Sequence, residues 1–520
     1  MTLQYNITID YMKKAFFTSL LFLPFLLSAQ TAKIKIDIDR TIGEIDPKIY
    51  GVFMEPIQFS GRRMGLPDSV KFNTLYGTLY DPSSPLADEN GFKKNYIEAM
   101  RELKVTNMRW PGGNYVAAYN WQDGIGPKEQ RPVRKELAWG GIDNNHVGTD
   151  EWVQLNKSIG SENVLCINLG LGNINDARYW VEYCNLKSGT YYSDLRVKYG
   201  NKEPFNIKFW CLGNEVDGSP WIMGHKNADD YCKIAIEAAK AMRATDNSIK
   251  FIANGSSHYS PGKWVDWNWK VITELRDIAD YISIHRYWER SDDYYTYVGQ
   301  GALDIEEKIN VLHSQINTAQ ALYRMKKPMY LSIDEYAPFG QNMMSTLAVA
   351  QYLNSFVRHA DVVKMANYTL MTSLLGNDNK KGTFKTPLFY TFKMFSNNCL
   401  GTSVDTFVAC DTFNTELYKG IPYLDVTTVY SKETNTVFIN VVNRHKDKAI
   451  TAEISNNAGT FAGKAEVSSI TGDKLLEPFT FDQYSNYQPS KKNADIKNNK
   501  ISYTFPPHSF TQIKVGAKKN

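Results

Sequence analysis

The strongest constraint on the fold is the alternation of short apolar segments with amphipathic helical segments between residues 47 and 396. Eight of the apolar segments have the length and the β-branched and aromatic content of buried strands. They are IYGVFME (49–55), VTNMRW (105–110), NVLCINLG (163–170), IKFWCLGNE (207–215), KFIANGS (250–256), YISIHRY (281–287), PMYLSIDEY (328–336) and KMANYTLM (364–371). Because apolar strands separated by helices form parallel sheets covered on both faces, and eight such units can close on themselves, we predict a (β/α)8 TIM barrel over residues 47–396.

The sequence pattern changes after residue 396, where segments such as LDVTTVYS and NTVFINVVNR alternate with period two. This alternation predicts a C-terminal antiparallel β-sandwich over residues 397–520. KIKIDIDR (33–40) alternates in the same way, ahead of the first barrel strand. We therefore expect residues 30–46 to form an N-terminal strand that joins the sandwich.

The N-terminus has the pattern of a secretory signal peptide. Lys13 and Lys14 precede an apolar run, which ends at the small residues Ser28 and Ala29. The run is too short for a membrane span, and no other apolar stretch reaches about 18 residues. Residues 1–29 are thus predicted to be a signal peptide, and the protein to be exported to the periplasm or the exterior without a membrane span.

Charge and cysteine spacing exclude several classes of function. The 59 basic and 55 acidic residues give a net charge of +4, which does not indicate a nucleic-acid or anionic-lipid partner. The six cysteines lack metal-type CxxC spacing; Cys166 and Cys211 lie in strand segments and are expected to be buried thiols, and Cys399 and Cys410 are near enough in sequence for a bridge that spacing alone does not establish. No HExxH, GxSxG or GxxxxGK[ST] motif occurs, so no cofactor is expected.

Polar residues gather at the ends of the predicted strands. Asn214 and Glu215 end the fourth strand, and Asp334 and Glu335 end the seventh. Because the carboxyl ends of barrel strands line the active-site mouth, these side chains are expected to meet there. The other polar residues at this rim are Glu55, Arg109, Asn114, His285 and Tyr287.

Two carboxylates on nearly opposite strands suit glycoside hydrolysis, in which one is protonated and the other ionised. Glu215 and Glu335 form the predicted pair, Asn214 is expected to hydrogen-bond a sugar hydroxyl, and Asp334 to orient the backbone or an arginine. A lone strand-end glutamate is also consistent with a rim salt bridge, and a lone histidine such as His285 with core packing. The carboxylates should lie about 5 Å apart in a retaining enzyme and about 9 Å apart in an inverting one.

Four motifs together are similar to those of glycoside hydrolase family 51, the α-L-arabinofuranosidases. They are RWPGGNYVAAYNWQDGIGPKEQRPVRKELAW, EPFNIKFWCLGNEVDG, YLSIDEY and RHADVVKMAN, which occur in the family's order. The resemblance implies a barrel with a β-sandwich, a retaining double displacement, Glu215 as acid/base and Glu335 as nucleophile, with no metal in the chemistry. It also implies that Glu55, Asn114, Asn214 and Tyr287 hold the furanose and that Trp139 lies near the leaving group. His285, at the same rim, is also predicted to bind substrate.

The sequence departs from the family pattern at several positions around the predicted pocket. Tyr336 and Phe339 stand in DEYAPFG, where a Trp-rich segment is usual, and Leu370 stands where the family carries a glutamine. HRY replaces His-Gln-Tyr, and FMEPI lacks the histidine that commonly follows the first-strand glutamate. These departures affect the substrate prediction more than the reaction type.

The sequence therefore predicts an exported, retaining exo-α-L-arabinofuranosidase that removes arabinose from side chains of plant-type arabinan or arabinoxylan. A homo-oligomer is a further expectation from the resemblance. Two alternatives stay open at this point. One is an endo-β-glucanase of the same family, and the other is a noncatalytic glycan-binding protein.

Overall fold

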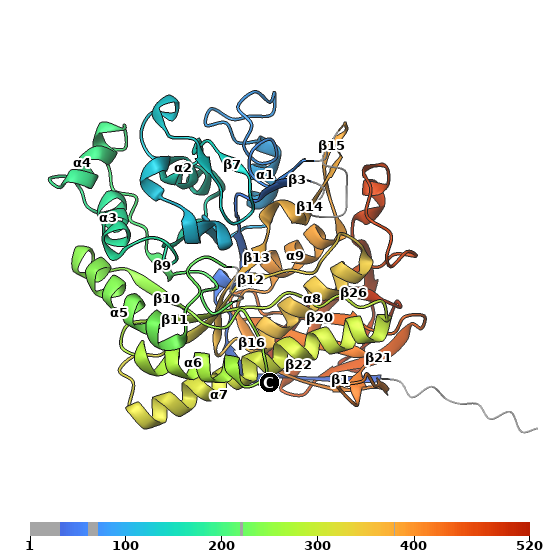
Figure 1. Ribbon diagram of the computed structural model, residues 1–520. Helices are drawn as coiled ribbons and strands as arrows, with labels where there is room; N and C mark the ends of the chain where they lie inside the picture. Colours follow the sequence, from blue (N-terminus) through green and yellow to red (C-terminus); the bar gives the residue numbers. More distant parts are fainter. Residues whose placement is uncertain (1–31, 61–70, 219–221, 379, 520) are drawn as a thin grey trace, which may run out of the picture.

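The computed structural model describes residues 32–60, 71–218, 222–378 and 380–519. Its centre is a closed parallel barrel of eight strands in the cyclic order β10-β11-β12-β13-β2-β5-β8-β9 (Figure 1). The barrel strands are β2 (Gly51–Phe53), β5 (Asn107–Trp110), β8 (Glu162–Cys166), β9 (Phe209–Leu212), β10 (Lys250–Asn254), β11 (Tyr281–His285), β12 (Tyr330–Tyr336) and β13 (Val363–Thr369). Each lies within or overlaps one predicted segment, so the TIM-barrel prediction is confirmed.

Helices surround the barrel, and several of them bury an apolar face against their neighbours. In α5, for example, the Asn227 side chain accepts a hydrogen bond from the Asp230 amide at 2.9 Å, which caps the helix start. Its buried residues recur at helical spacing: Tyr231, Cys232, Ala235, Ala238, Ala239 and Met242. The α-helices are α1 (Lys94–Glu102), α2 (Thr149–Ile159), α3 (Ile174–Asn185), α4 (Tyr191–Lys198), α5 (Ala228–Thr245), α6 (Lys263–Glu274), α7 (Gly301–Tyr323), α8 (Met343–Arg358) and α9 (Pro387–Asn398).

Most of the C-terminal part forms a β-rich domain whose strands belong to one hydrogen-bonded sheet of ten strands, in the order β23-β22-β26-β20-β19-β16-β1-β21-β25-β24. The N-terminal strand β1 lies in this sheet, antiparallel to β16 and parallel to β21. The parallel pair differs from the purely antiparallel prediction; it arises because β1 comes from the far end of the chain rather than from a hairpin. The strands are β1 (Ala32–Glu44), β16 (Thr402–Ala409), β19 (Leu424–Ser431), β20 (Thr436–Asn443), β21 (Ile450–Asn456), β22 (Gly459–Ile470), β23 (Ser490–Ala494), β24 (Ile496–Lys497), β25 (Lys500–Phe505) and β26 (Ser509–Lys519).

The barrel and the β-rich domain share a packed boundary formed by α8 and β20. All residues of β20 are buried, because Ile439 faces the internal core of the sheet and Phe438 faces the helices of the barrel. All residues of α8 except Arg358 are buried as well. Figure 1 shows α8 and α9 between the barrel and strands β20 and β26. A helix that is buried on all its faces is typical of an element enclosed on both sides.

A buried ionic network crosses this boundary. The Asp425 carboxylate on β19 accepts a hydrogen bond from Arg358 on α8 at 2.6 Å and lies 3.5 Å from Arg444. Glu306 on α7 pairs with Arg358 and with His359, the latter at 2.5 Å. The barrel helices and the sheet are thus joined by charge as well as by apolar packing.

Among the described residues, four short antiparallel strand pairs lie outside the barrel and the ten-stranded sheet. They are β3 (Gln58–Ser60) with β4 (Lys71–Asn73), β6 (Arg134–Lys135) with β7 (Ile142–Asp143), β14 (Leu375–Asp378) with β15 (Gly382–Lys385), and β17 (Thr412–Phe413) with β18 (Ile421–Pro422). None was predicted, since strands of two to four residues are too short to show alternation.

The structure also bears on the predictions for the cysteines and for membrane-spanning helices. In the described part of the chain every cysteine is a free thiol, including Cys399 and Cys410. No helix among the described residues combines the length and the apolar character that crossing a membrane requires. The predicted signal peptide (1–29) lies outside the described residues, and the predicted boundaries of the domains stay predictions.

Candidate active site

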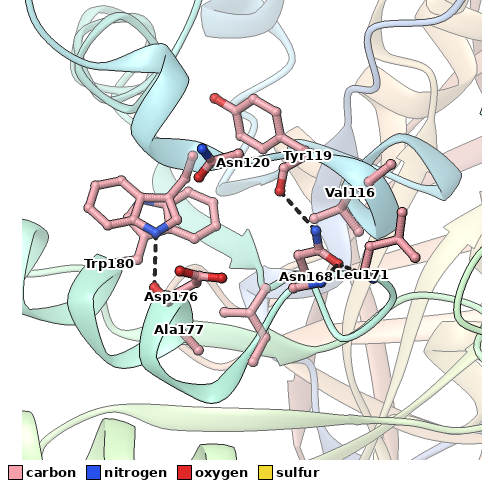
Figure 2. A pocket seen from close by; sticks show the side chains of 12 residues that line it. Val116, Tyr119, Asn120, Asn168, Leu171, Asp176, Ala177 and Trp180 are labelled. Atoms are coloured by element: carbon pink, nitrogen blue, oxygen red, sulfur yellow. Dashed lines mark hydrogen bonds between the residues drawn. The ribbon is translucent and has the colours of Figure 1, made fainter. Parts of the chain in front are cut away.

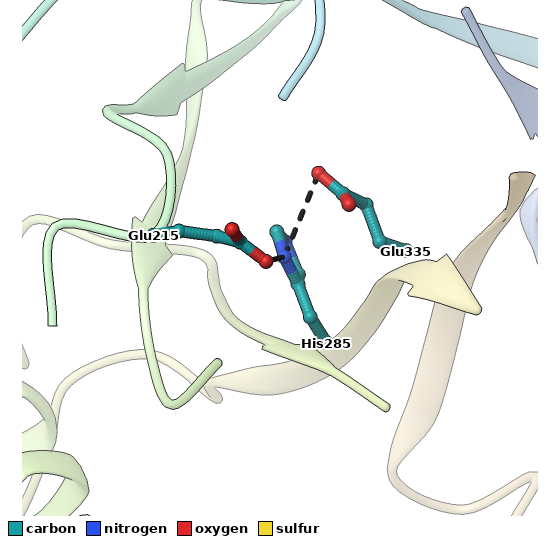
Figure 3. A group of neighbouring side chains, drawn as sticks. All are labelled: Glu215, His285 and Glu335. Atoms are coloured by element: carbon teal, nitrogen blue, oxygen red, sulfur yellow. Dashed lines mark hydrogen bonds and ion pairs between the residues drawn. The ribbon is translucent and has the colours of Figure 1, made fainter. Parts of the chain in front are cut away.

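Glu215 and Glu335 face each other across the carboxyl-terminal end of the barrel, with His285 beneath them (Figure 3). Glu335 is the penultimate residue of β12, and His285 is the last residue of β11. Glu215 follows β9 through Gly213, and both residues have a left-handed backbone, with φ of 47° and 87° respectively. Such a conformation is rare for a non-glycine residue and is concentrated at functional sites.

The three side chains make direct contacts. His285 Nδ1 lies 2.9 Å from Glu215 Oε1 and 3.5 Å from Glu335 Oε1. One nitrogen or oxygen of each residue lies within 4.8 Å of the corresponding atoms of the other two. The two carboxyl groups are therefore close enough to act on the two atoms of one bond in a substrate.

Glu335 is held by two strong donors. Arg109 donates from Nη1 to Oε1 at 2.8 Å, and the Tyr287 hydroxyl donates to Oε2 at 2.7 Å. The Glu335 side chain is only 5 % exposed, whereas the Glu215 side chain is 17 % exposed. Hydrogen bonds to both oxygens of a carboxylate fix its orientation.

Arg109 organises the site from the end of β5. Its Nε lies 3.3 Å from Asp334 Oδ2, and its Nη2 donates to Asn214 Oδ1 at 2.7 Å. Burial by itself lowers the pKa of Arg109, but the negative groups around it, of which Asp334 contributes most, together outweigh burial and raise the pKa well above the usual value. The pKa of Asp334 is lowered, because the charge of Arg109 and the bond to His285 outweigh its burial. This buried pair keeps both charges at pH 7.

The surroundings of Glu215 favour its protonated form. Burial raises the pKa of Glu215, and the negative charge of Glu335 raises it further against the opposing hydrogen bond from His285. Burial by itself lowers the pKa of His285, but the charge of Glu335 and the bonds to Asp334 and Glu215 outweigh it and raise the pKa well above 6.5. Both shifts run in the same direction, towards the protonated forms of Glu215 and His285.

Glu55 follows β2 and lies against the turn after β5 formed by Pro111, Gly112 and Gly113, which we name the PGG turn. Its Oε1 accepts hydrogen bonds from the Tyr115 amide and the Trp139 indole, both at 2.8 Å. Burial and the charge of Glu335 raise the pKa of Glu55 to about 8. A Cβ on Gly113 would lie 2.2 Å from Glu55 Oε2, so glycine is required for this close approach.

The structure brings all eight predicted site residues into one neighbourhood, although their roles stay predictions. Asn214 Nδ2 lies 3.5 Å from Asn114 Oδ1, which connects the fourth strand to the turn after β5. Trp139 reaches the site through its indole bond to Glu55.

Sequence reasoning missed the contacts of two residues. Arg109 was recognised as a polar strand end, but no local pattern indicates that it bonds Glu335, 226 positions away. Glu136 was not considered; its carboxylate accepts hydrogen bonds from the amides of residues 138–140 and so holds the turn that carries Trp139. An acidic residue two positions before a turn would have been the available signal.

The departures from the family pattern differ in their positions. Tyr336 does not line the site; its ring is fully buried and packs against Tyr352 and Phe356. Phe339 does lie beside the site, since it stacks on Tyr287 with ring centroids 5.8 Å apart. Leu370 follows β13 and packs its side chain against the barrel core.

The trio of Glu215, His285 and Glu335 also offers three potential metal ligands. Metal binding requires a neutral histidine, whereas the pKa of His285 is raised. Glu335 is moreover already bonded through both oxygens. The arrangement suits proton transfer and nucleophilic attack better than coordination of a cation.

A separate cavity of about 160 Å³ lies beside the barrel mouth, between the loops that follow β5 and β8 (Figure 2). The Asn168 side chain in its wall is already bonded within the protein, since it donates to the Tyr119 carbonyl at 2.9 Å. Trp121 and Trp180 stack in its wall, and neither catalytic candidate lines it. This cavity is distinct from the carboxylate pair.

Comparison with known proteins agrees with this geometry. Residues 99–298 match the family described as "Alpha-L-arabinofuranosidase 1 domain", and residues 334–509 match "Alpha-L-arabinofuranosidase C-terminal domain". The chain is 35 % identical to the intracellular exo-α-(1→5)-L-arabinofuranosidase 1 of Bacillus subtilis, over 93 % of this chain and 99 % of that protein. It is 35 % identical to the intracellular exo-α-(1→5)-L-arabinofuranosidase of Halalkalibacterium halodurans, over 81 % and 86 % of the two chains.

Solved structures that resemble this fold include α-L-arabinofuranosidases of family 51. The thermostable GH51 α-L-arabinofuranosidase of Thermotoga petrophila superimposes with a TM-score of 0.82 at 31 % identity, over 93 % of this chain and all of that chain. These matches favour the arabinofuranosidase prediction over the endo-β-glucanase and the noncatalytic glycan-binding alternatives.

The same comparison corrects the prediction of location. Export to the periplasm or the exterior was predicted from the N-terminal pattern, and that prediction is wrong on this comparison, because both bacterial relatives are named intracellular enzymes. An apolar run after two lysines is a short local pattern that does not by itself establish export.

Proposed function

The chain belongs to glycoside hydrolase family 51, the α-L-arabinofuranosidases, and from this membership we propose that it works by a retaining double displacement between Glu335 and Glu215. It is a glycosidase that releases terminal arabinofuranose. The observation that carries the mechanism is the close approach of the two carboxyl groups: one oxygen of Glu215 lies within 4.8 Å of one oxygen of Glu335. The hydrogen-bond partners of the two groups also differ. An inverting enzyme needs a separation of about 6.5–9.5 Å to admit a water molecule.

In the first step Glu335 attacks the anomeric carbon of the arabinofuranosyl unit. The bond from that carbon to the leaving oxygen breaks, and Glu215 transfers its proton to this oxygen, so the leaving sugar departs as an alcohol. Arg109 and Tyr287 hold the attacking carboxylate in place. The products of the step are a covalent arabinofuranosyl ester on Glu335 and an ionised Glu215.

In the second step Glu215 acts as a base. It takes a proton from a water molecule, whose oxygen attacks the anomeric carbon and breaks the ester bond to Glu335. Arabinose leaves with its original anomeric configuration, and both carboxyl groups return to their starting forms. His285 lies between them and supports the negative charge that moves from one to the other.

The remaining predicted residues are proposed to hold the furanose ring. The amides of Asn214 and Asn114 lie next to one another and can bond adjacent hydroxyl groups. Glu55, which is protonated below a pKa of about 8, can donate from its second oxygen while the first accepts from Trp139. Bonds to ring hydroxyls near the anomeric carbon strengthen in the transition state.

The natural substrate is proposed to be an arabinose-containing glycan such as arabinan or the side chains of arabinoxylan. The names of the Bacillus subtilis and Halalkalibacterium halodurans relatives point to α-1,5-linked arabinose. Such a glycan offers the terminal furanosyl unit that the proposed mechanism requires.

The test is hydrolysis of p-nitrophenyl α-L-arabinofuranoside by the full chain and by Glu335→Ala. We expect nitrophenol release by the wild type and a loss of several orders of magnitude in kcat for the variant. Glu237→Ala is the matched control, since Glu237 is an exposed carboxylate on α5 that pairs with Lys240. Equal rates for the wild type and Glu335→Ala would disprove the assignment.

A further inference from the structure

Two hairpins continue outward from the catalytic residues as an apolar surface, which we name the aromatic lip and define as Trp139, Phe59 and Phe72. Resting on the proposed function, we propose that the aromatic lip binds the sugar units of the leaving group beyond the first, so that the preferred substrate is an oligosaccharide or polysaccharide chain.

The lip starts at the reaction site. Trp139 donates its indole hydrogen to Glu55 Oε1 at 2.8 Å, so one edge of its ring is fixed beside the furanose position. Its main chain is fixed as well, because the Trp139 amide donates a hydrogen bond to Glu136 Oε2 at 2.6 Å. A ring held at both points is ordered before substrate arrives, which reduces the entropy lost on binding.

The lip continues from Trp139 to the hairpin of β3 and β4. Phe59 packs on Trp139 with ring centroids 6.4 Å apart, and Phe72 stacks on Phe59 at 4.9 Å with an interplanar angle of 23°. Phe59 and Phe72 are directly paired across the two strands, so both rings lie on one face of the hairpin.

The two hairpins are in close contact. A Cβ on Gly141, in the turn between β6 and β7, would lie 2.5 Å from Cβ of Gln58 on β3. Only glycine permits this approach, which brings Phe59 within reach of Trp139. The lip is therefore one surface built from two loops rather than two separate rings.

The chemistry of the lip suits a sugar chain. Phe72 is 40 % exposed although its other side packs on Phe59, and Leu137 is also exposed on the neighbouring hairpin. Aromatic faces bind the C–H faces of sugars through apolar contact, and an exposed apolar surface that adjoins a site marks binding of ligand or partner. Because the surface is continuous with the carboxylate pair through Glu55, its occupant is the remainder of the substrate.

The test compares leaving groups of different length. We measure kcat/KM of the full chain for α-1,5-linked arabinobiose and arabinotetraose, in the wild type and in Phe72→Ala. The lip predicts that the ratio of kcat/KM for the tetraose to that for the biose falls about tenfold in Phe72→Ala, which corresponds to the loss of one aromatic contact. Phe72→Trp should restore the ratio.

Phe407→Ala is the matched control, since Phe407 is a 57 % exposed phenylalanine on β16 of the β-rich domain, and its ratio should equal that of the wild type. An unchanged ratio in Phe72→Ala would overturn the lip while leaving the proposed function intact. Failure of the wild type to hydrolyse either arabinoside would instead overturn the proposed function and the lip together.

Discussion

Glu215 and Glu335 are the same kind of side chain, and their surroundings make them differ. The Glu335 side chain is bonded to Arg109 and Tyr287, whereas the Glu215 side chain is bonded to His285. Desolvation without a permanent cation raises the pKa of Glu215. At the scale of single residues, the proposed division into acid and nucleophile rests on which carboxylate Arg109 reaches.

The role of Glu215 as acid predicts a dependence on the leaving group. In Glu215→Ala, kcat/KM should fall about 10²–10⁴-fold for arabinobiose, whose leaving oxygen needs a proton. It should fall far less for 2,4-dinitrophenyl α-L-arabinofuranoside, whose leaving group departs without one. Steady-state kinetics on both substrates measures this. A uniform loss on the two substrates would contradict acid catalysis by Glu215.

The raised pKa of Glu55 predicts a step in the pH profile. Glu55 is protonated below a pKa of about 8, and ionisation above it removes a hydrogen-bond donor and adds a charge near Glu335. With the dinitrophenyl substrate, kcat/KM of the wild type should fall as the pH rises through about 8. Glu55→Gln, which mimics the protonated form, should lose no more than about tenfold in kcat/KM and should lack this step.

A Glu55→Gln profile with the same step as the wild type would assign the ionisation to another group. Glu237→Gln serves as the control, because Glu237 is exposed on α5 and its substitution should leave the profile unchanged.

At the scale of elements, the ends of the strands position the chemistry. β9, β11 and β12 each deliver one member of the trio from their carboxyl-terminal ends. In the turn after β5, Gly112 and Gly113 lie directly against the Glu55 side chain. This close approach allows the Tyr115 amide to donate to Glu55. Rigid strands with short, tightly packed turns hold the reacting groups in place before substrate binds.

The PGG turn gives a test at this scale. Gly113→Ala would place a Cβ 2.2 Å from Glu55 Oε2, so Glu55 must move and lose its bonds to Tyr115 and Trp139. We expect a folded protein with strongly reduced kcat/KM, measured together with a melting curve. Gly472→Ala is the control, because its Cβ would meet only the Met343 side chain at 3.1 Å. Full activity of Gly113→Ala would contradict the proposed role of the turn.

Much of the fold and the identity of the carboxylate pair could be predicted from the sequence, because apolar strand segments and polar strand ends are local patterns. The bond from Arg109 to Glu335 could not, since it joins residues 226 positions apart and no periodicity records it. The parallel pairing of β1 with β21 and the short hairpins were missed for similar reasons. Packing against distant neighbours, as with Tyr336, also decides which rings line a pocket.

At the scale of the whole molecule, the β-rich domain is joined to the barrel by the ionic network around Asp425. Its carboxylate is buried and bonds Arg358 and Asn354, and it neighbours Arg444. The charge of Arg444 and of Arg358 outweighs burial and lowers the pKa of Asp425. The network therefore stabilises the contact between the two parts without touching the reaction site.

Asp425→Ala should lower the free energy of unfolding by about 3–5 kcal/mol, because it leaves Arg444 buried without a counter-charge. Urea denaturation measures the change, and kcat on the aryl substrate should stay near the wild-type value at 25 °C. Asp405→Ala is the control, since Asp405 is more exposed and pairs with an exposed Arg40. Equal stability of Asp425→Ala and the wild type would contradict the account of the boundary.

Acid should weaken the same boundary. Arg358 and His359 outweigh burial and lower the pKa of Glu306 from 4.5 to about 2. A carboxyl group with a lowered folded-state pKa contributes stability that is present above its unfolded pKa and is lost as the pH falls from about 4.5 towards 2. The decline in unfolding free energy over this range should be shallower in Glu306→Gln, and an identical decline would exclude Glu306 as a cause.

The most direct test of the mechanism is mass spectrometry of the protein during turnover. Glu215→Ala incubated with 2,4-dinitrophenyl α-L-arabinofuranoside should form the first ester quickly and hydrolyse it slowly, because the base for the second step is absent. Peptide mapping should then find one arabinofuranosyl group on Glu335. An adduct on another residue, or turnover without any adduct and with inverted arabinose as the first product, would contradict the assignment of Glu335 as nucleophile.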